Sequence, residues 1–280
     1  MKTKKAIEYA PGHVTGFFKI FSRGSTGAGF NVPKAMKTRV KATEAAKNKI
    51  EVRINGKIEK AQTSKIAAQK MLKLTKGKKY SLQIRHETKF PIGHGLGLSG
   101  AGALSLARAL NKALSLGLGD KEVVKIAADA DIEAGTGLGD VIAEQYSGMI
   151  MGSKPYPSKK ALKIKNAYSH AVFAFFGEIS TKKIIRSKKW KQKINKTGDW
   201  CMHELSKNKN SQNFLHASRA FAIETGLAQM ASRKVRAIME QFPNSSMAML
   251  GNSAFVLTNN PTQTQKKLGK FCKKIAAAKI

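Results

Sequence analysis

A run of glycines that leads directly into an apolar segment is the feature of this chain best suited to chemistry. Residues 91–102 contain glycines at positions 93, 95, 97, 100 and 102 together with Ser99, and the apolar segment Ala103–Leu116 follows. Backbone amides at the start of a helix have no acceptor within the helix, and the helix dipole adds partial positive charge there. Glycines also let the backbone approach an anion without an intervening Cβ atom. We therefore predict that this run binds phosphate; the alternative is a structural turn that packs a helix against a strand.

Two familiar phosphate motifs do not account for this run. The pattern GxxxxGK[ST] is absent from the chain. The segment 95–100 does match GxGxxG, and Asp120 lies 20 residues beyond Gly100. A dinucleotide-binding fold, however, needs a second strand that ends at that acidic residue. Residues 116–119 indicate the end of a helix instead, and Pro91 stands where the first strand should run into the turn, so this interpretation is disfavoured.

Asp140 is the best candidate for acid–base chemistry. It is one of five aspartates, and it follows a second glycine-rich segment, 135–139. In phosphoryl transfer a carboxylate beside the accepting hydroxyl group can take its proton or orient it. The position after Gly139 also suits the N-cap of the next helix. Both interpretations remain open.

The glycine run resembles the PxxxGLGxS motif of the GHMP kinases, the superfamily of galactokinase, homoserine kinase and mevalonate kinase. Residues 10–12 resemble the N-terminal motif of these kinases, and residues 137–140 resemble the segment that carries their catalytic aspartate. Within the superfamily, residues 8–150 are most similar to the archaeal pantoate kinases. The segments that carry this similarity are 11–18, 24–29, 99–104 and 133–140.

The resemblance implies an α+β fold of two lobes. An N-terminal lobe like ribosomal protein S5 would span residues 1–153, and a ferredoxin-like C-terminal lobe would span residues 154–280. The implied activity is ATP-dependent phosphorylation of (R)-pantoate to (R)-4-phosphopantoate in coenzyme A biosynthesis, with ATP and Mg²⁺ bound. Two alternatives stay open: a kinase for mevalonate, homoserine or shikimate, and a non-catalytic basic protein that binds nucleic acid.

The resemblance also implies roles for individual residues. Asp140 would be the catalytic base, and Ser99 and Glu133 would hold the metal ion. The structural alternatives are a helix cap for Ser99 and a surface position for Glu133. The residues expected to contact ATP are Pro91, Gly93, Gly95, Leu96, Gly97, Leu98, Ser99, Gly100 and Ala101.

The acceptor pantoate carries a carboxylate, which requires a cation or hydrogen-bond donors. Arg23, beside the segment 24–29, is the best-placed arginine, although it suits an ordinary surface position equally well. The expected hydrogen-bonding residues are His13, Thr15, Ser25 and Thr26. His13 stands where many members of the superfamily have a lysine. Their third motif, a glycine-rich C-terminal loop, is retained here only in part, in residues 247–253.

Sequence periodicity predicts the elements that position these residues. Asn55-Gly56 predicts a tight hairpin turn after the strand Lys49–Ile54. A strand at Ile7–Tyr9 should end at residues 10–12, and Asp120 should cap the helix Lys121–Ala134. The other predicted strands are 36–43, 80–85, 171–176, 246–250 and 254–258, and the other predicted helices are 64–74, 103–116, 181–194, 212–231, 234–241 and 266–278.

The charge of the chain is strongly positive and unevenly distributed. The formal net charge is +34. Residues 1–90 carry 22 basic and 5 acidic residues, residues 151–280 carry 25 and 5, and residues 91–150 carry 4 and 7. The excess of basic over acidic residues is thus absent from residues 91–150, the block that contains the glycine run and Asp140. The basic residues of the chain are 42 lysines and 9 arginines, whereas base and phosphate recognition favours arginine. A solvated lysine surface is therefore favoured over a nucleic-acid site.

Several other classes of protein are disfavoured by composition. Two cysteines exclude a disulfide scaffold, and the chain contains no CxxC motif. The basic N-terminus is not followed by an apolar run of signal-peptide length, and the apolar stretch 171–176 is too short to span a bilayer. We expect a cytoplasmic protein with no membrane partner and a small-molecule substrate, and a homodimer is possible.

Overall fold

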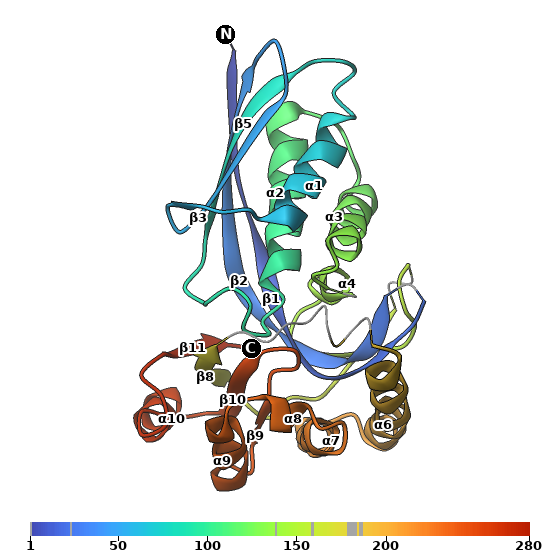
Figure 1. The fold of residues 1–280 in the computed structure, drawn as a ribbon, viewed down its shortest axis with the longest axis vertical. Helices are drawn as coiled ribbons and strands as arrows, with labels where there is room; N and C mark the ends of the chain where they lie inside the picture. Colours follow the sequence, from blue (N-terminus) through green and yellow to red (C-terminus); the bar gives the residue numbers. More distant parts are fainter. Residues whose placement is uncertain (1, 23, 138, 158–159, 178–183, 185–186) are drawn as a thin grey trace. The chain divides into compact units, whose positions relative to one another are not determined.

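The chain folds into two compact units that interleave along the sequence (Figure 1). The computed structural model describes residues 2–22, 24–137, 139–157, 160–177, 184 and 187–280. Unit 1 consists of Met1–Gly12, Lys34–Lys89 and Gly97–Gln145, and unit 2 consists of His13–Pro33, Phe90–Leu96 and Tyr146–Ile280. The expected division into lobes at residues 153 and 154 stays a prediction.

A mixed sheet provides the framework of unit 1, although its strands β6 and β7, the end of β1 and the start of β2 belong to unit 2. Its strand order is β4-β3-β5-β2-β6-β7, with β1 also paired to β2. Strands β3 and β5 are parallel, whereas β2 is antiparallel to β5. The bounds of the strands are β1 Thr3–Ile20, β2 Ser25–Glu44, β3 Lys49–Ile54, β4 Lys57–Ile58, β5 Tyr80–Glu87, β6 Met149–Gly152 and β7 Ala161–Lys163. The φ angles of 47° at Asn55 and 84° at Gly56 confirm the predicted tight turn between β3 and β4.

Helices cover one face of this sheet. They are α1 Gln62–Leu72, α2 Leu98–Leu114, α3 Asp120–Ala134 and the short α4 Asp140–Ala143. Figure 1 shows α2 between the sheet and the other helices, which explains why α2 is apolar on nearly all sides. A buried polar network joins the layers: the Thr38 hydroxyl contacts Ser105 Oγ of α2 at 2.6 Å and His86 Nδ1 at 2.8 Å, and His86 Nε2 contacts Ser64 Oγ of α1 at 3.0 Å. Burial lowers the pKa of His86 to about 4, so this network is held by a neutral imidazole.

An antiparallel sheet forms the core of unit 2. Its strand order is β11-β8-β10-β9. When these four strands are numbered along the chain, their order in the sheet is 4-1-3-2, and helices follow the first and third strands. This is the ferredoxin-like arrangement predicted for this part of the chain. The strands are β8 His170–Gly177, β9 Ser245–Met247, β10 Asn252–Thr258 and β11 Ile275–Lys279, and the helices are α6 Lys188–Lys207, α7 Ser211–Glu224, α8 Leu227–Met230, α9 Arg233–Gln241 and α10 Pro261–Leu268. Buried phenylalanines fill the core, with the rings of Phe30 and Phe255 packed edge to face at 5.1 Å.

The predicted helix over 266–278 is wrong. Helix α10 begins earlier, where the Asn260 side chain accepts a hydrogen bond from the Gln263 amide at 3.1 Å, and it ends at Leu268. Residues Ile275–Lys279 form β11, an edge strand paired with β8. Alanine has the highest helix propensity, yet the hydrogen bonds offered by the unpaired edge of β8 outweigh the small preference of each residue.

Three smaller expectations are also corrected. Strand β1 does not end at Pro11 but continues to Ile20, because β1 pairs only with β2 among the described strands and an edge strand tolerates proline. The helix expected over 212–231 is divided into α7 and α8 at Gly226, whose φ angle is 82°. Gly119, rather than Asp120, is the N-cap of α3, and the Glu122 carboxylate accepts a hydrogen bond from its amide at 2.9 Å.

Part of the helix expected over 181–194 lies outside the described residues, and α6 is described from Lys188. Among the described residues, no helix combines the length and the apolar composition needed to cross a bilayer.

Candidate active site

The glycine run adopts the turn that its sequence predicts. Gly93, Gly95 and Gly97 have φ angles of 79°, 82° and 64°, a region that side chains with a Cβ atom rarely enter. Gly97 is the N-cap of α2, and the Ala101 amide donates to its carbonyl oxygen at 3.0 Å. The backbone amides of residues 98–100 have no hydrogen-bond acceptor within the helix, so they are available to an anion. The start of α2 therefore has the geometry of a phosphate site, and phosphate binding itself stays a prediction.

A second loop in unit 2 supports the first half of the run, where Ile92, Gly93, His94, Gly95 and Leu96 lie. The Ser253 hydroxyl donates to the His94 carbonyl oxygen at 2.6 Å. A Cβ atom on Gly251 would lie 2.3 Å from that oxygen and 2.5 Å from the Gly95 nitrogen. Only glycine fits this contact, so residues 247–253, in which the sequence retains only part of a motif, position the glycine run directly.

The same loop is tied to the first strand. The Met249 amide donates to the Thr15 carbonyl oxygen of β1 at 3.0 Å. Thr15 faces the part of β2 that follows Thr26, because a Cβ atom on Gly29 would lie 2.3 Å from the Val14 carbonyl oxygen. Thr15 therefore lies on β1, and Ser25 and Thr26 lie at the start of β2, the strand paired with it; their role in binding the acceptor stays a prediction. Arg23, expected to bind the acceptor carboxylate, lies outside the described residues.

His13 is buried and neutral. Its Nδ1 contacts the Asn31 side-chain oxygen at 2.7 Å, while the Asn31 side-chain nitrogen donates to the Tyr146 carbonyl oxygen at 2.8 Å. This second hydrogen bond orients the Asn31 amide, so Nδ1 of His13 carries the proton. Burial lowers the pKa of His13 to about 4. His13 therefore supplies hydrogen bonds but not the positive charge of the lysine found in many GHMP kinases.

Asp140 begins α4 in unit 1. Gly139, rather than Asp140, is the N-cap of this helix. The Asp140 side chain is half-buried, and burial raises its pKa to about 6. A carboxyl group with this pKa is ionised at neutral pH yet accepts a proton more readily than an exposed aspartate.

Asp131 lies close to Asp140 and is held by α3 and the turn after it. The Thr136 hydroxyl donates to Asp131 Oδ1 at 2.8 Å, and it contacts the Thr63 hydroxyl of α1 at 2.8 Å. A Cβ atom on Gly137 would lie 2.1 Å from Asp131 Oδ2, so the glycine turn closes directly over the carboxylate. Burial, together with the negative charge of Asp140, raises the pKa of Asp131 to about 7.

Glu144 completes a cluster of three interacting carboxyl groups. It is 2% exposed, and neither of its carboxylate oxygens has a hydrogen-bond partner. A Cβ atom on Gly100 of α2 would lie 3.3 and 3.4 Å from these oxygens. Burial, followed by the charges of Asp140 and Asp131, raises the pKa of Glu144 well above its usual value. The cluster of Asp131, Asp140 and Glu144 thus lies beside the first turn of α2.

The sequence analysis missed Asp131 and Glu144. Two signals could have identified them. Asp131 falls on the apolar face of α3, seven residues after Val124 and three before Ala134, where an ordinary surface aspartate is not expected. Glu144 lies four residues after Asp140, so the two share one face of a helical turn.

The two residues expected to hold a metal ion differ in their surroundings. Ser99 is half-buried in the first turn of α2. Glu133 extends toward solvent, where its carboxylate forms an ion pair with Lys70 at 2.8 Å. The metal role of Glu133 stays a prediction, and Asp131, two residues earlier, is the buried carboxylate of α3.

The binding of Mg²⁺ by this chain stays a prediction. Within the described ranges no group of three or more His, Cys, Asp or Glu side chains is placed so that it could hold a metal ion. Mg²⁺ at kinase sites needs no such group, because it binds one or two protein carboxylates together with phosphate oxygens and water. The raised pKa values of Asp131 and Glu144 mean that these carboxyl groups retain protons more readily than exposed ones, and a bound cation would favour their ionised forms.

Comparisons with known proteins agree with this arrangement. Residues 62–148 match the family model "GHMP kinases N terminal domain". The chain is 33% identical to the pantoate kinase of Methanocaldococcus jannaschii, covering 91% of this chain and 93% of the relative. It is 28% identical to the pantoate kinase of Thermococcus kodakarensis over 92% of this chain and 89% of the relative.

Solved structures show the same fold. One described as "Phosphotransferase related to CoA biosynthesis pathway" superposes with a TM-score of 0.84 and 25% identity, covering 100% of this chain and 96% of that one. The homoserine kinase of Cytophaga hutchinsonii superposes with a TM-score of 0.67 and 17% identity, covering 99% of this chain and 95% of that one. The expected two-sheet α+β fold is confirmed.

The first prediction concerns the buried carboxylate of Asp131. Its pKa in the folded protein, about 7, lies above the value of 3.8 for an exposed aspartate. The folded state therefore binds an extra proton between these values, and stability falls as the pH rises through that window. Without divalent cations, Asp131→Asn should raise the free energy of unfolding at pH 8 by on the order of 2 kcal/mol, and the gain should disappear near pH 4. Urea unfolding at both pH values measures this.

Glu133→Gln on the same helix is the matched control. Because its side chain is 56% exposed, it should change stability by less than about 1 kcal/mol at either pH. An Asp131→Asn variant that is less stable than the wild type at pH 8 would contradict the assignment of a destabilising buried charge.

The second prediction concerns the hydrogen bond from Ser253 to the glycine run. Ser253→Ala should lower the free energy of unfolding by about 1 kcal/mol and speed amide hydrogen exchange at residues 94–96. Ser246→Ala is the matched control, because Ser246 is equally buried on the neighbouring strand and its hydroxyl has no partner. Equal effects of the two substitutions on exchange would show that the loop does not hold the glycine run.

Proposed function

The chain belongs to the GHMP kinases, in the family of the archaeal pantoate kinases, and we propose that it phosphorylates the 4-hydroxyl group of (R)-pantoate with ATP. The product would be (R)-4-phosphopantoate, an intermediate for coenzyme A. The observation that carries the proposal is the position of the carboxyl cluster beside the glycine-opened start of α2 in unit 1. Phosphate binding and proton transfer need these two features close together.

We assign the triphosphate of ATP to the glycine run, residues 91–101. The left-handed turns at Gly93, Gly95 and Gly97 and the amides at the start of α2 support this assignment. Residues 247–253 would hold the run in its binding conformation through Ser253 and Gly251. Preorganised amides stabilise negative charge without rearranging during the reaction.

Asp140 would act on the accepting hydroxyl group. The hydroxyl oxygen forms a bond to the γ-phosphorus, the bond from that phosphorus to the bridging oxygen of ADP breaks, and the hydroxyl proton passes to the Asp140 carboxylate. Its raised pKa of about 6 suits this role, because the carboxylate is ionised before the reaction and takes the proton easily.

Ser99 and Asp131 would hold Mg²⁺ in this proposal. The buried position of Asp131 favours it over Glu133, whose side chain pairs with Lys70 at the surface. Mg²⁺, when bound, neutralises charge on the phosphate oxygens and orients them. His13, Thr15, Ser25 and Thr26 would bind the acceptor through hydrogen bonds, and Arg23 would bind its carboxylate.

The third prediction tests the substrate. The purified chain should release ADP from ATP with (R)-pantoate, and kcat/KM should be at least about a hundredfold lower with mevalonate, homoserine or shikimate, because polar groups built for one acceptor reject others. A coupled ADP-release assay over these four acceptors measures this. Turnover with one of the other three but not with pantoate would leave a GHMP kinase with a different acceptor.

The fourth prediction tests Asp140. Asp140→Asn should lower kcat by about 10²–10⁴-fold, because the amide cannot take a proton. In the wild type, kcat/KM should be level above pH 6 and fall about tenfold per pH unit below it, since Asp140 must be ionised.

Asp120→Asn serves as the control, because Asp120 is an exposed residue paired with Arg108 on the same unit. Its kcat should stay within about twofold of the wild-type value. Asp140→Asn with wild-type kcat, or a pH profile without a break near pH 6, would remove Asp140 from the mechanism.

A further inference from the structure

The face of the unit 1 sheet that points away from the helices carries a basic surface that the proposed kinase function does not use. Along β2 and β5, side chains alternate between buried and exposed positions. The buried set, which includes Thr38 and His86, packs toward α1 and α2. The exposed set lies on the opposite face. We name this face the arginine face; its cations are Lys37, Arg39 and Lys41 of β2, Lys49 and Arg53 of β3, and Arg85 of β5.

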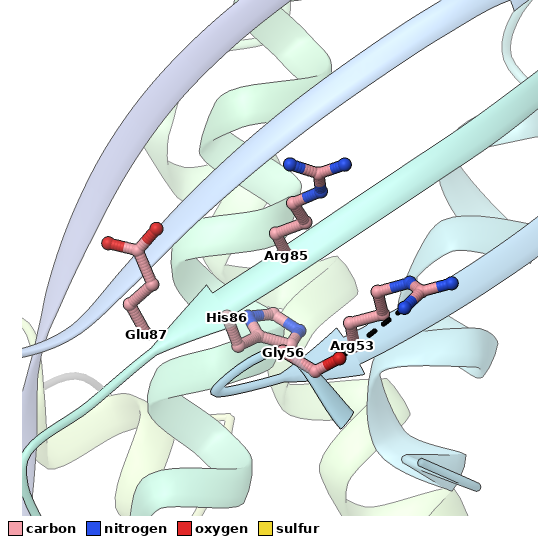
Figure 2. Close-up of a pocket in the computed structure, with 5 residues that line it drawn as sticks. All are labelled: Arg53, Gly56, Arg85, His86 and Glu87. Carbon is pink, nitrogen blue, oxygen red and sulfur yellow. Dashed lines mark hydrogen bonds between the residues drawn. The ribbon is translucent and has the colours of Figure 1, made fainter. Parts of the chain in front are cut away.

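Three arginines form a row across three neighbouring strands. Arg85 is paired in register with Arg39 on one side and with Arg53 on the other. Neighbouring strands are about 4.8 Å apart, so the row spans roughly 10 Å. Figure 2 shows the guanidinium groups of Arg53 and Arg85 extending from adjacent strands. These three are a third of the arginines in the chain, and they gather on one surface.

The central arginine of the row, Arg85, is the least neutralised. The hydrogen bond from Arg53 is the main cause that lowers the pKa of Glu51, and the charge of Arg85 contributes less to this lowering. The Nε atom of Arg39 contacts Glu87 at 2.9 Å, and the Nε atom of Arg53 contacts Glu51 at 2.8 Å. Arg85 makes no hydrogen bond or ion pair with any described residue. Like charges directly opposite one another destabilise a sheet. Glu87 and Glu51 offset this repulsion for Arg39 and Arg53, and an anion would offset it for Arg85.

The surface is extended rather than confined to one pocket. Arg53, Gly56, Arg85, His86 and Glu87 line an open hollow of about 380 Å³ (Figure 2). Further cations lie beyond it on the same face, Lys37 and Lys41 on β2 and Lys49 on β3, each about 7 Å from the next exposed position of its strand. Among the described residues, Glu51 and Glu87 are the carboxylates of β2, β3 and β5 on this face.

An exposed aromatic ring borders the cations. Tyr9 of β1, the strand beside β2, is 43% exposed, and the ammonium groups of Lys34 and Lys37 lie 5.7 and 6.0 Å from its ring centroid. A flat sheet face with phosphate-binding cations and an aromatic ring matches what single-stranded nucleic acids require, because phosphates pair with the cations and an unstacked base lies on the ring.

We propose that the arginine face, together with Tyr9, binds single-stranded nucleic acid, for which a single-stranded RNA is the probe. The extent of the cations favours a polyanion over a single phosphate group, and the exposed ring favours unpaired bases over a duplex. The proposal does not rest on the kinase function, because none of its residues belongs to the glycine run or the carboxyl cluster.

Fluorescence anisotropy with a labelled 12-nucleotide RNA of mixed sequence tests the proposal on the full chain. The variant Arg39→Gln/Arg53→Gln/Arg85→Gln should bind at least tenfold more weakly than the wild type at 100 mM salt. Its slope of log K against log salt should be shallower by about 2, since each lost phosphate contact on a single strand contributes about 0.7. Tyr9→Ala should weaken binding at least about fivefold.

The matched control is Lys188→Gln/Lys189→Gln/Lys196→Gln, which removes the same charge from exposed positions of α6. This control should bind RNA within about twofold of the wild type. Equal losses in the two triple variants would overturn the proposal, because net charge alone would explain the binding. Displacement of the RNA by tripolyphosphate at equal phosphate concentration would also overturn it in favour of a small-anion site, as would a duplex that binds more tightly than the single strand.

ADP release by the arginine variant separates this proposal from the kinase function. Turnover should match the wild type, which shows that the variant is folded and that the arginine face is separate from catalysis. A variant that loses RNA binding and ADP release together would overturn the claim of a separate surface.

Discussion

The burial of three carboxyl groups beside the start of one helix is the constraint on which the rest of unit 1 depends. Asp131, Asp140 and Glu144 hinder one another's ionisation, as their raised pKa values record. A stable fold does not need such a cluster, because burying charge without a partner costs free energy. The surrounding residues are selected to tolerate it: Gly137 closes over Asp131, Thr136 donates to it, and Gly100 leaves room for Glu144. Buried carboxyl groups with raised pKa values mark a candidate functional site, and the proposed binding of a cation and a phosphate would account for this cluster at a helix start.

In unit 2 the main structural constraint is a different one, the close approach of two loops. His94 and Gly95 of the glycine run touch Gly251 at distances that no Cβ atom could enter. The hydrogen bond from the Ser253 hydroxyl to the His94 carbonyl oxygen stabilises this contact. The hydrogen bond from the Met249 amide to the Thr15 carbonyl oxygen links the same loop to β1. Three segments far apart in the sequence are thereby fixed together inside one unit. The fixed contact gives the run a single conformation, which reduces the entropy that a flexible glycine loop would lose on binding a ligand.

Local patterns in the sequence predicted most of the elements but not the contacts between them. The turn at Asn55-Gly56 and the helix after the glycine run follow from short-range rules, and both are confirmed. The strand at 275–279 was missed because its pairing with β8 lies a hundred residues away in sequence and overrides the helical preference of its alanines. Asp131 was not considered for a similar reason. The resemblance pointed to Glu133, whose metal role stays a prediction, whereas the burial that distinguishes Asp131 from Glu133 is determined only by the fold.

The arrangement of positive charge on the folded chain is a second feature that the sequence alone did not predict. Composition reports 9 arginines among 51 basic residues, and from that ratio a diffuse lysine surface is the reasonable expectation. Strand register is what brings Arg39, Arg53 and Arg85 into one row, although they are separated by 14 and 32 positions along the chain. A β-sheet converts a two-residue period on each strand into a grid of side chains on each face. Basic residues that are far apart in the sequence can therefore lie side by side when three strands pair in register. A surface on which cations are concentrated can bind one anionic ligand in preference to others, whereas evenly spread cations attract all anions alike.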